Sequence, residues 1–422
     1  MTKQEAVIKY IEDNYLQFNR LRHDVISDKL QIRLSGEEAM RLLGERQEYW
    51  REMTKQDINS IVCHCAQECD VNITSREVMT ALQSDLIPDV HPLREYIHSL
   101  KPYTPDQPDW IDFVASQVKV KPSGEEAKGN KARDEELWRA CFKKWFVAMV
   151  ASWMKDEVVN HQVLVLIGKQ GIFKTTWLEH LIPPHLRAYA CKLANSNELN
   201  KDERLRIAEF GLISLDEIDS MNNRELNQLK SIITATDVNE RAAYAYTKER
   251  RVRLASFCAS GNRRDFLTDI TGNRRWLPFE VESIQNPFHT QLPYEQMYAE
   301  AWALAQDPLF SYWFDLNEIE VLEQHNQHFR DESNEEQLLD VYFAVPTTDA
   351  TNAKFLTTAE ISERLIYYGN IKKPMTLSRL GVLLSQKGFL SVRRGNPSRR
   401  GWIIYERESQ EVNAERAILS KH

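Results

Sequence analysis

The first hundred residues place apolar side chains three and four positions apart, which is the spacing of one face of a helix. The positions that follow this spacing are Ile58, Ile61, Val62, Cys65, Ala66, Val78, Ala81 and Leu82. The pattern predicts a helical N-terminal region at residues 1–100. Residues 101–133 contain four prolines and two glycines, which end regular elements, so we expect a linker or exposed loop there.

Farther along the chain, strand-like and helix-like patterns alternate. A helical pattern rich in tryptophan and phenylalanine at 135–154 leads into the uninterrupted apolar segment 163–167. The alternation continues to about residue 280. It is typical of a three-layer α/β domain with a largely parallel sheet, which we place at residues 134–315.

The pattern changes again after this α/β domain. Residues 357–366 and 376–386 are expected to form helices, and residues 389–405 a β hairpin. Two helices followed by a hairpin are the arrangement of a winged-helix domain. We place such a domain at 338–406 and a C-terminal tail at 407–422.

A glycine-rich loop, GKQGIFKTT at 168–176, follows the apolar segment and precedes an amphipathic helix. The order strand, loop, helix suits a nucleoside triphosphate, because backbone N–H groups and the helix N-terminus surround the phosphates. Lys174 would reach the β and γ oxygens, and Thr175 would ligate magnesium. We therefore expect ATP and Mg²⁺ as cofactors. The nucleotide-binding residues are Gly168, Gly171, Lys174, Thr175 and Thr176.

One position departs from the general phosphate-loop pattern, because Phe173 stands where a second glycine is expected. If that position needs a positive φ, phenylalanine is strained there, but Gly171 could carry the unusual backbone conformation instead. An ordinary strand, turn and helix with a chance lysine is the alternative interpretation, and the context of the motif disfavours it. The effect of Phe173 on nucleotide affinity stays open.

Two acidic residues end the next apolar segment, 210–215. Asp216 and Glu217 lie about 40 residues after the loop, at a strand end where open α/β sheets bind ligands. Asp216 suits a magnesium ligand, and Glu217 suits the base that polarises the attacking water. Asp219 is explained as an exposed acid or a helix cap.

A third apolar segment, 254–260, ends in Gly261 and Asn262. An amide at this position can hydrogen-bond the γ-phosphate or the lytic water, which is the sensor role in multimeric ATPases. A turn is the alternative, since Gly-Asn pairs are common turn formers. The two preceding motifs favour the sensor.

A pair of arginines, Arg274 and Arg275, follows on a further loop. Either could act as an arginine finger on the γ-phosphate of a neighbouring subunit, which implies a ring. The alternative is a local pair with Asp265 or Asp269, and we expect that of at least one arginine.

These blocks resemble the virulence-associated protein E family. The resemblance is carried by GKQGIFKTT, LDEID (215–219), SFCASGN (256–262) and FLTDITGNRRW (266–276). The segment VHPLREYI at 90–97 also resembles the family's upstream His-Pro-x-x-Glu-Tyr element. The resemblance therefore covers roughly residues 50–285.

The resemblance implies a P-loop AAA+ type ATPase core, similar to superfamily 3 helicases of phages, plasmids and integrated elements. It implies a hexameric DNA helicase that works with a separate primase, since no primase segment is evident here. By motif it places nucleotide binding at Gly171, Lys174 and Thr175, the catalytic acids at Asp216 and Glu217, the sensor at Asn262 and the finger at Arg274 or Arg275. A nucleotide-dependent initiator or helicase loader with little unwinding activity is the alternative. A small-molecule P-loop kinase is disfavoured by the basic C-terminal region.

The net charge of −8 means that any contact with DNA must come from local basic patches. Residues 241–275 contain nine basic residues against three acids. Within them, 244–252 alternates as a hairpin whose Lys248, Arg250 and Arg251 could hold single-stranded DNA in a ring channel. A solvated edge hairpin is the alternative.

The second basic patch, at 364–405, has nine Lys or Arg and no acid. Its hairpin arginines would contact duplex DNA, unless the domain docks protein instead. These arginines are Arg393, Arg394, Arg399 and Arg400.

Composition limits the remaining choices. A length of 422 residues suits two or three domains, and no apolar run approaches the roughly 18 residues that span a bilayer, so we expect a cytoplasmic protein. The six cysteines are expected to be reduced thiols. The cluster of Cys63, His64, Cys65 and Cys69 lacks a second ligand pair, so it does not predict a zinc site.

Overall fold

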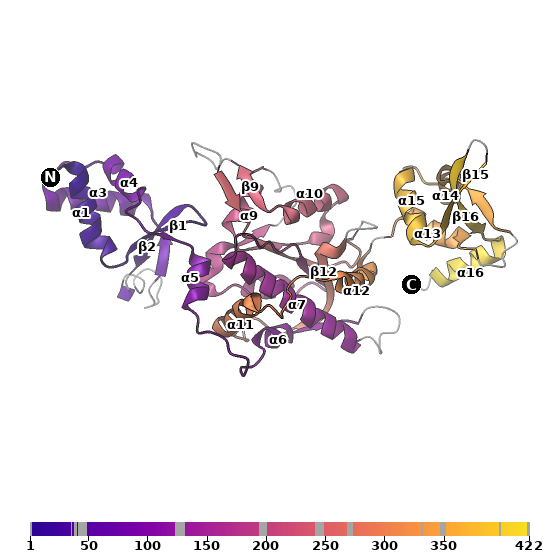
Figure 1. Cartoon of the computed structure of the whole chain (residues 1–422), viewed down its shortest axis with the longest axis horizontal. Helices are drawn as coiled ribbons and strands as arrows, with labels where there is room; N and C mark the ends of the chain where they lie inside the picture. Colours follow the sequence, from indigo (N-terminus) through magenta and orange to yellow (C-terminus); the bar gives the residue numbers. More distant parts are fainter. Residues whose placement is uncertain are drawn as a thin grey trace. The chain divides into compact units, whose positions relative to one another are not determined.

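The computed structural model describes residues 2–34, 36–37, 40, 49–122, 131–193, 201–240, 249–267, 273–330, 332–346, 352–395 and 398–419. The chain forms two compact units of mixed α/β structure (Figure 1). The large unit comprises Met1–Arg264 and Arg274–His325, and the small unit comprises Asp265–Asn273 and Asn326–His422. None of the described helices is long and apolar enough to cross a membrane.

The large unit begins with helices α1 (Lys3–Ile11), α3 (Lys55–Cys69) and α4 (Ser75–Leu82). Each helix begins with a capping box, in which a threonine hydroxyl accepts the third backbone N–H and an acidic side chain accepts from the threonine N–H. These helices share one apolar core that includes Ile61 and Cys65. Cys65 therefore packs as a small apolar side chain within α3.

A small sheet, which helical periodicity did not predict, accompanies these helices. Its order is β3 (Tyr49–Glu52), β2 (Lys29–Leu34), β1 (Leu21–Asp24) and β4 (Asp89–Val90). The first three strands are antiparallel, and β4 is parallel to β1. The strands have two to six residues, and β1 buries the polar Arg22 and Asp24, so their apolar alternation is weak.

The segment expected as a linker, 101–133, is ordered in its middle. Helix α5 (Pro92–Ser99) precedes it, and α6 (Trp110–Ala115) and β5 (Val118–Val120) lie within it. Strand β5 pairs antiparallel with β12 (Trp276–Ile284), and the apolar residues of α6 are buried. Three of the four prolines stand directly before α6, which Asp109 caps, and Pro122 follows β5.

The main sheet of the large unit has the order β5-β12-β6-β11-β8-β7. Strands β6 (Val163–Ile167), β7 (Ala190–Leu193), β8 (Leu212–Leu215), β11 (Ser256–Gly261) and β12 are parallel to their neighbours, and only β5 is antiparallel. Strands β6, β8 and β11 are buried along their whole length. Burial on both faces explains their continuous apolar sequences.

Helices cover both faces of this sheet, with α9 (Lys201–Glu209) and α10 (Asn223–Thr234) on one side and α6, α7 (Lys131–Met154) and α11 (Tyr294–Gln306) on the other (Figure 1). The aromatic residues of α7 form the centre of the core. The indole N–H groups of Trp145 and Trp153 donate to the carbonyls of Phe257 and Gly211, at 3.0 and 3.1 Å. The unit also contains α8 (Lys174–His180) and α12 (Leu316–Asn326).

The small unit contains α13 (Asn334–Tyr342), α14 (Thr358–Gly369), α15 (Leu377–Gln386) and α16 (Ser409–Leu419). Its sheet pairs β16 (Arg399–Glu406) with β13 (Phe343–Ala344), β14 (Lys354–Leu356) and β15 (Leu390–Arg394). The two predicted helices and the predicted hairpin are therefore present as α14, α15 and β15–β16. Helix α16 occupies most of the segment expected as a tail.

Candidate functional site

The glycine-rich loop joins β6 to α8. A Cβ atom at Gly168 would lie 2.9 Å from the carbonyl oxygen of Val281, so only glycine fits there. Both Gly171 and Phe173 have positive φ, at 83° and 67°. The strain foreseen at Phe173 is therefore present, of order 1–3 kcal/mol, and the partly buried ring packs against the main core.

Lys174 lies at the centre of the loop and is only 7% exposed. Its Nζ donates to the carbonyl oxygens of Gly168 and Lys169, both at 2.7 Å, and lies 3.3 Å from Oδ1 of Asn262. Burial lowers the pKa of Lys174, while the negative charges of Asp219 and Asp216 oppose that shift. The loop thus holds a nearly buried ammonium group at the start of α8, a donor of the kind that phosphate oxygens accept.

Asp216 lies at the end of β8 within a set of oxygen atoms. Its Oδ1 accepts from the hydroxyls of Thr175 at 3.2 Å and Ser260 at 2.7 Å, and its Oδ2 lies 2.8 Å from Nζ of Lys192. Burial alone would raise the pKa of Asp216, but hydrogen bonds from Lys192 and Ser260 lower it. A carboxylate beside a threonine hydroxyl fits Mg²⁺, which prefers oxygen ligands and completes its shell with water and phosphate.

These residues share one cavity of about 290 Å³ at the carboxyl ends of β6, β8 and β11. Glu217 also lines it and adopts a left-handed backbone conformation, with φ of 51°. Such conformations cluster at functional sites. The lining residues are Gln170, Gly171, Phe173, Lys174, Thr175, Thr176, Asp216, Glu217, Ser260, Gly261 and Asn262.

Asp219 has a role that the sequence did not suggest. Its two carboxylate oxygens accept the backbone N–H groups of Asn262 and Arg263, each at 3.1 Å. It therefore fixes the backbone that carries Asn262. The preceding residue must be glycine, because a Cβ atom at Gly261 would lie 2.8 Å from Oδ1 of Asp219. The sequence signal for this role is that Asp219 follows Glu217 by two residues and therefore lies at the same end of the parallel strands.

Arg274 and Arg275 lie at the opposite end of the strands, near the first residue of β6. Trp276, the next residue, pairs with Val163 at the start of β6, whereas the loop leaves from the end of β6. Arg274 is exposed and Arg275 is half-buried. The structure therefore brings together the predicted residues from 168 to 262 and keeps these two arginines apart from them.

Of the hairpin predicted at 244–252, residues 244–248 lie outside the described residues, and 249–252 form β10 (Glu249–Val252), which pairs antiparallel with β9 (Asp237–Glu240). Lys248 lies outside the described residues, and only the backbone of Arg250 is described. Arg251 pairs with Asp28 at 3.1 Å and with Glu209 at 3.8 Å, at the base of the hairpin. Of the three residues predicted to contact single-stranded DNA, Arg251 has a described side chain, and that side chain is ion-paired within the unit.

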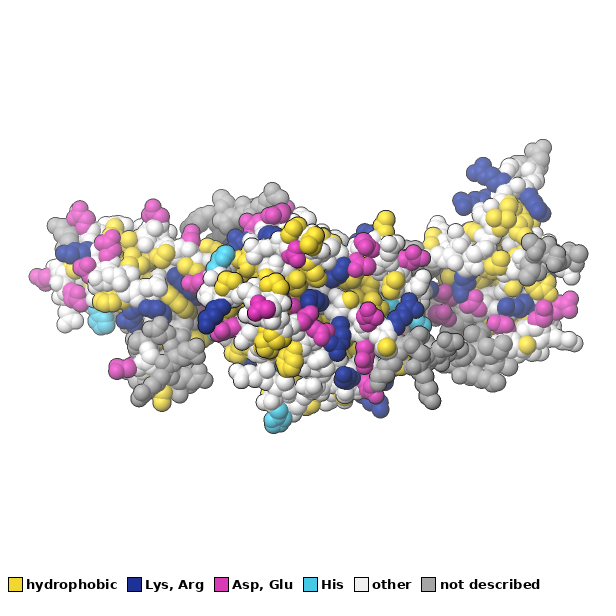
Figure 2. Space-filling model, turned by 60° about the horizontal axis from the view of Figure 1, so that its bottom comes forward, with side chains coloured by type: hydrophobic (Ala, Val, Ile, Leu, Met, Phe, Trp, Pro, Cys, Tyr) yellow, Lys and Arg dark blue, Asp and Glu magenta, His cyan; other side chains and the backbone are white. Residues whose placement is uncertain are grey.

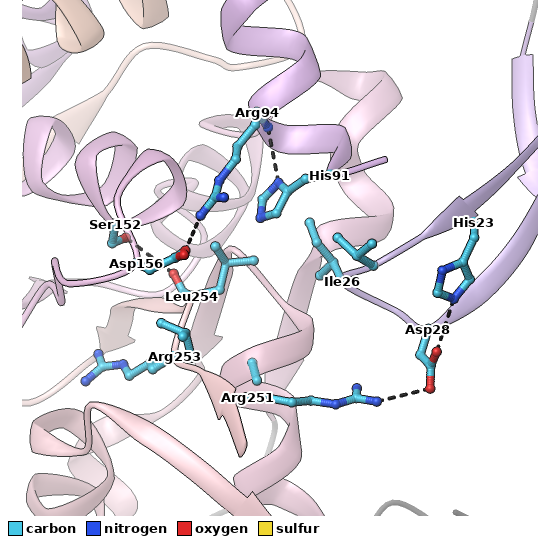
Figure 3. Close-up of a pocket in the computed structure, with 13 residues that line it drawn as sticks. His23, Ile26, Asp28, His91, Arg94, Ser152, Asp156, Arg251, Arg253 and Leu254 are labelled. Carbon is cyan, nitrogen blue, oxygen red and sulfur yellow. Dashed lines mark hydrogen bonds and ion pairs between the residues drawn. The ribbon is translucent and has the colours of Figure 1, made fainter. Parts of the chain in front are cut away.

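Next to this base, the β1–β2 turn and the hairpin enclose a second cavity, of about 340 Å³ (Figure 3). On its wall, Asp28 bridges Arg251 and His23, and His23 also contacts Asp89 at 2.8 Å. Burial lowers the pKa of His23, but the hydrogen bonds to Asp89 and Asp28 outweigh it and raise that pKa. The Asp28–Arg251 pair joins the β1–β2 turn to the hairpin, whereas Arg94 on the same wall pairs with Asp156.

Arg253, directly after the hairpin, is only 1% exposed. Its guanidinium donates to the carbonyls of Ala255, Asn160, Ala235 and Ile233. Burial lowers its pKa to about 9, which still leaves it charged at neutral pH. Arg253 is therefore a structural anchor and not part of a basic surface.

In the small unit, four arginines face one another across the β15–β16 hairpin. Arg393 is paired in register with Arg400, and Arg394 with Arg399. All four are exposed, and Figure 2 shows basic side chains gathered at one end of this unit. Like charges directly opposite each other destabilise a strand pair, so this arrangement costs stability unless an anion offsets it.

Comparisons with known proteins agree with the resemblance at the level of the domain. Residues 127–331 match the model of the virulence-associated protein E-like domain. This segment contains the loop, the two acids, Asn262 and both arginines. No curated protein sequence matches the chain.

Two solved structures of one protein region are distantly similar. The apo structure of the NrS-1 C-terminal region (305–718) has a TM-score of 0.46 and 11% identity, covering 95% of this chain and 99% of that one. The A form apo structure of the same region has a TM-score of 0.45 and 11% identity, covering 92% and 98%.

Proposed function

We propose that this chain is an ATP-dependent DNA helicase or translocase that acts in the replication of a phage, plasmid or integrated mobile element. The observation that carries the proposal is the 290 Å³ cavity, in which Lys174, Asp216 and Asn262 converge at one sheet edge. The match to the virulence-associated protein E-like domain supports the setting in mobile-element replication. In this proposal the main sheet is a P-loop AAA+ core, and the small unit is a winged helix.

Within the cavity, each residue has a distinct task. The loop N–H groups and Lys174 bind the phosphates, and Thr175 with Asp216 would hold Mg²⁺, which neutralises charge on the β- and γ-phosphates. Glu217 accepts the proton of the attacking water, and Asn262 orients that water or the γ-phosphate. Asp219 keeps Asn262 in place through the backbone.

A complete site requires a second subunit. Strand β6 has five residues, so Arg274 and Arg275 start roughly 15 Å from the loop of their own chain. An arginine finger from that edge would serve the cavity of a neighbour, which places hydrolysis between subunits. Repeating this head-to-tail contact closes a ring, and we infer a hexamer by analogy with the family.

The wing arginines are expected to bind duplex DNA through its phosphates. Replacing Arg393, Arg394, Arg399 and Arg400 together by alanine should weaken duplex binding and reduce the slope of log affinity against log salt by up to about 4, because each lost phosphate contact removes about 0.9. Filter binding or fluorescence anisotropy between 50 and 200 mM salt, roughly the range where such slopes are resolved, measures both effects.

Replacing the same four arginines by lysine is the matched control, since lysine keeps the charge that phosphates attract. The alanine variant should melt close to the wild-type temperature, because the loss of cross-strand repulsion offsets the lost contacts of Arg394 with Phe355 and of Arg400 with Ser391. Unchanged duplex binding by the alanine variant would instead make the hairpin a protein-docking surface.

The test of the proposed function is ATP turnover by the full chain with no DNA, with single-stranded DNA and with a forked duplex, together with strand displacement. DNA-stimulated turnover and displacement are expected from the wild type. Lys174→Ala should lose turnover, and Lys119→Ala, at an exposed lysine of β5 outside the cavity, is the matched control. DNA binding with little turnover and no displacement would favour the initiator or loader. A hairpin that binds duplex DNA is compatible with that alternative too.

A further inference from the structure

We infer that Phe288 is the base-stacking residue of the nucleotide site, so that the purine ring of ATP lies on its exposed face. This inference rests on the proposed ATPase function and extends it from the phosphates to the base. No motif described above includes Phe288, which lies in the loop between β12 and α11.

The ring of Phe288 is held beside the phosphate loop by two aromatic contacts. Its centroid lies 6.4 Å from that of Phe173 and 5.5 Å from that of His180, with interplanar angles of 79° and 87°. These perpendicular contacts fix the ring but cover little of it, since Phe288 is 70% exposed. Exposed apolar side chains are common, but this one contacts Phe173, which lines the cavity of the glycine-rich loop.

The direction of α8 leads a bound nucleotide toward this ring. Thr176 lines the phosphate cavity, and the Nδ1 of His180 donates to the carbonyl oxygen of Thr176 at 2.7 Å. Residues four apart lie on the same helix face, separated by about 6 Å along the axis. With its phosphates around Lys174, a nucleotide extends its ribose and base past Thr176 toward His180 and Phe288.

The chemistry of the site agrees with this placement. Aromatic side chains stack on nucleobases and accept every base, because every base has a π face. The Phe173–Phe288 contact also gives a use to the residue that departs from the phosphate-loop pattern, since glycine at 173 could not support the ring. We therefore expect recognition of the base by stacking and only slight discrimination between ATP and GTP.

The experiment compares ATP with inorganic tripolyphosphate, each with Mg²⁺, in calorimetric binding to the full chain. Phe288→Ala should weaken ATP binding about ten-fold or more and leave tripolyphosphate binding unchanged, because a stacked base accounts for that difference. Phe288→Tyr should bind ATP within about two-fold of the wild type, because it keeps the stacking ring. Leu309→Ala, at a residue that is 93% exposed, is the matched control and should change neither affinity.

Lys174→Ala separates the two levels of the argument. Loss of both ligands in Lys174→Ala supports the phosphate site. If Phe288→Ala then changes the affinity for both ligands equally, or for neither, the stacking role is overturned and the phosphate site remains. If the wild type binds neither ligand, the proposed function fails. A change in assembly on gel filtration that accompanies Phe288→Ala would also overturn the stacking role, because it would assign the ring to a subunit contact.

Discussion

Glu217→Gln is expected to abolish ATP turnover and to leave ATP binding intact. Glutamine keeps the size of the side chain but cannot accept the proton that the attacking water releases, which lowers kcat by about 10²–10⁴-fold. The groups proposed to bind the phosphates, Lys174 and the loop backbone, are not altered. Steady-state turnover together with equilibrium binding of ATP measures the two effects separately.

Lys174→Ala is expected to give the contrasting result, because it removes the ammonium group proposed to contact the phosphates. Both binding and turnover should be lost in that variant. If Glu217→Gln retained turnover within about ten-fold of the wild type, a different group would activate the water. If it lost ATP binding instead, the left-handed backbone at Glu217 would belong to the fold of the cavity and not to the chemistry.

The double variant Arg274→Ala, Arg275→Ala should bind ATP normally and lose about 10³–10⁵-fold in kcat, which is the usual contribution of an arginine finger. The two single variants then show which arginine acts. Arg274 is the exposed one of the pair. Turnover of each variant, with assembly checked by gel filtration, measures the effect.

Mixing this double variant with Lys174→Ala tests whether the arginines act on a neighbour. Each variant is expected to be inactive alone. An interface is complete when its loop comes from the double arginine variant, which keeps Lys174, and its arginines come from the Lys174→Ala variant. In a random equal mixture, about a quarter of the interfaces meet that condition, so activity should partly return. Absence of recovery from variants that co-assemble would place the arginines within their own subunit.

The main sheet and its site could be predicted from the sequence for a physical reason. Strands that are buried on both faces need apolar residues at every position, so β6 and β11 were visible as uninterrupted runs. In a parallel sheet their carboxyl ends meet at one edge, and the polar residues that follow them therefore share a cavity. Lys174, Asp216 and Asn262 were found in this way.

Other features depend on contacts between distant parts of the chain. Strand β5 has three residues and is a strand because β12 lies beside it. The function of Asp219 requires two N–H groups that lie more than forty positions later in the chain. Arg253 was counted with a basic surface, because the sequence does not show which of several neighbouring arginines turns toward buried carbonyl groups.

The base of the β9–β10 hairpin is attached on two sides, and this attachment has a mechanical consequence. Arg253 ties it to the carbonyls of Asn160 and Ile233, beside the main sheet, while Arg251 ties it to Asp28 in the N-terminal part of the same unit. Strands β9 and β10 can therefore move relative to the main sheet only when these hydrogen bonds and this ion pair break, so their position is coupled to that of the N-terminal strands.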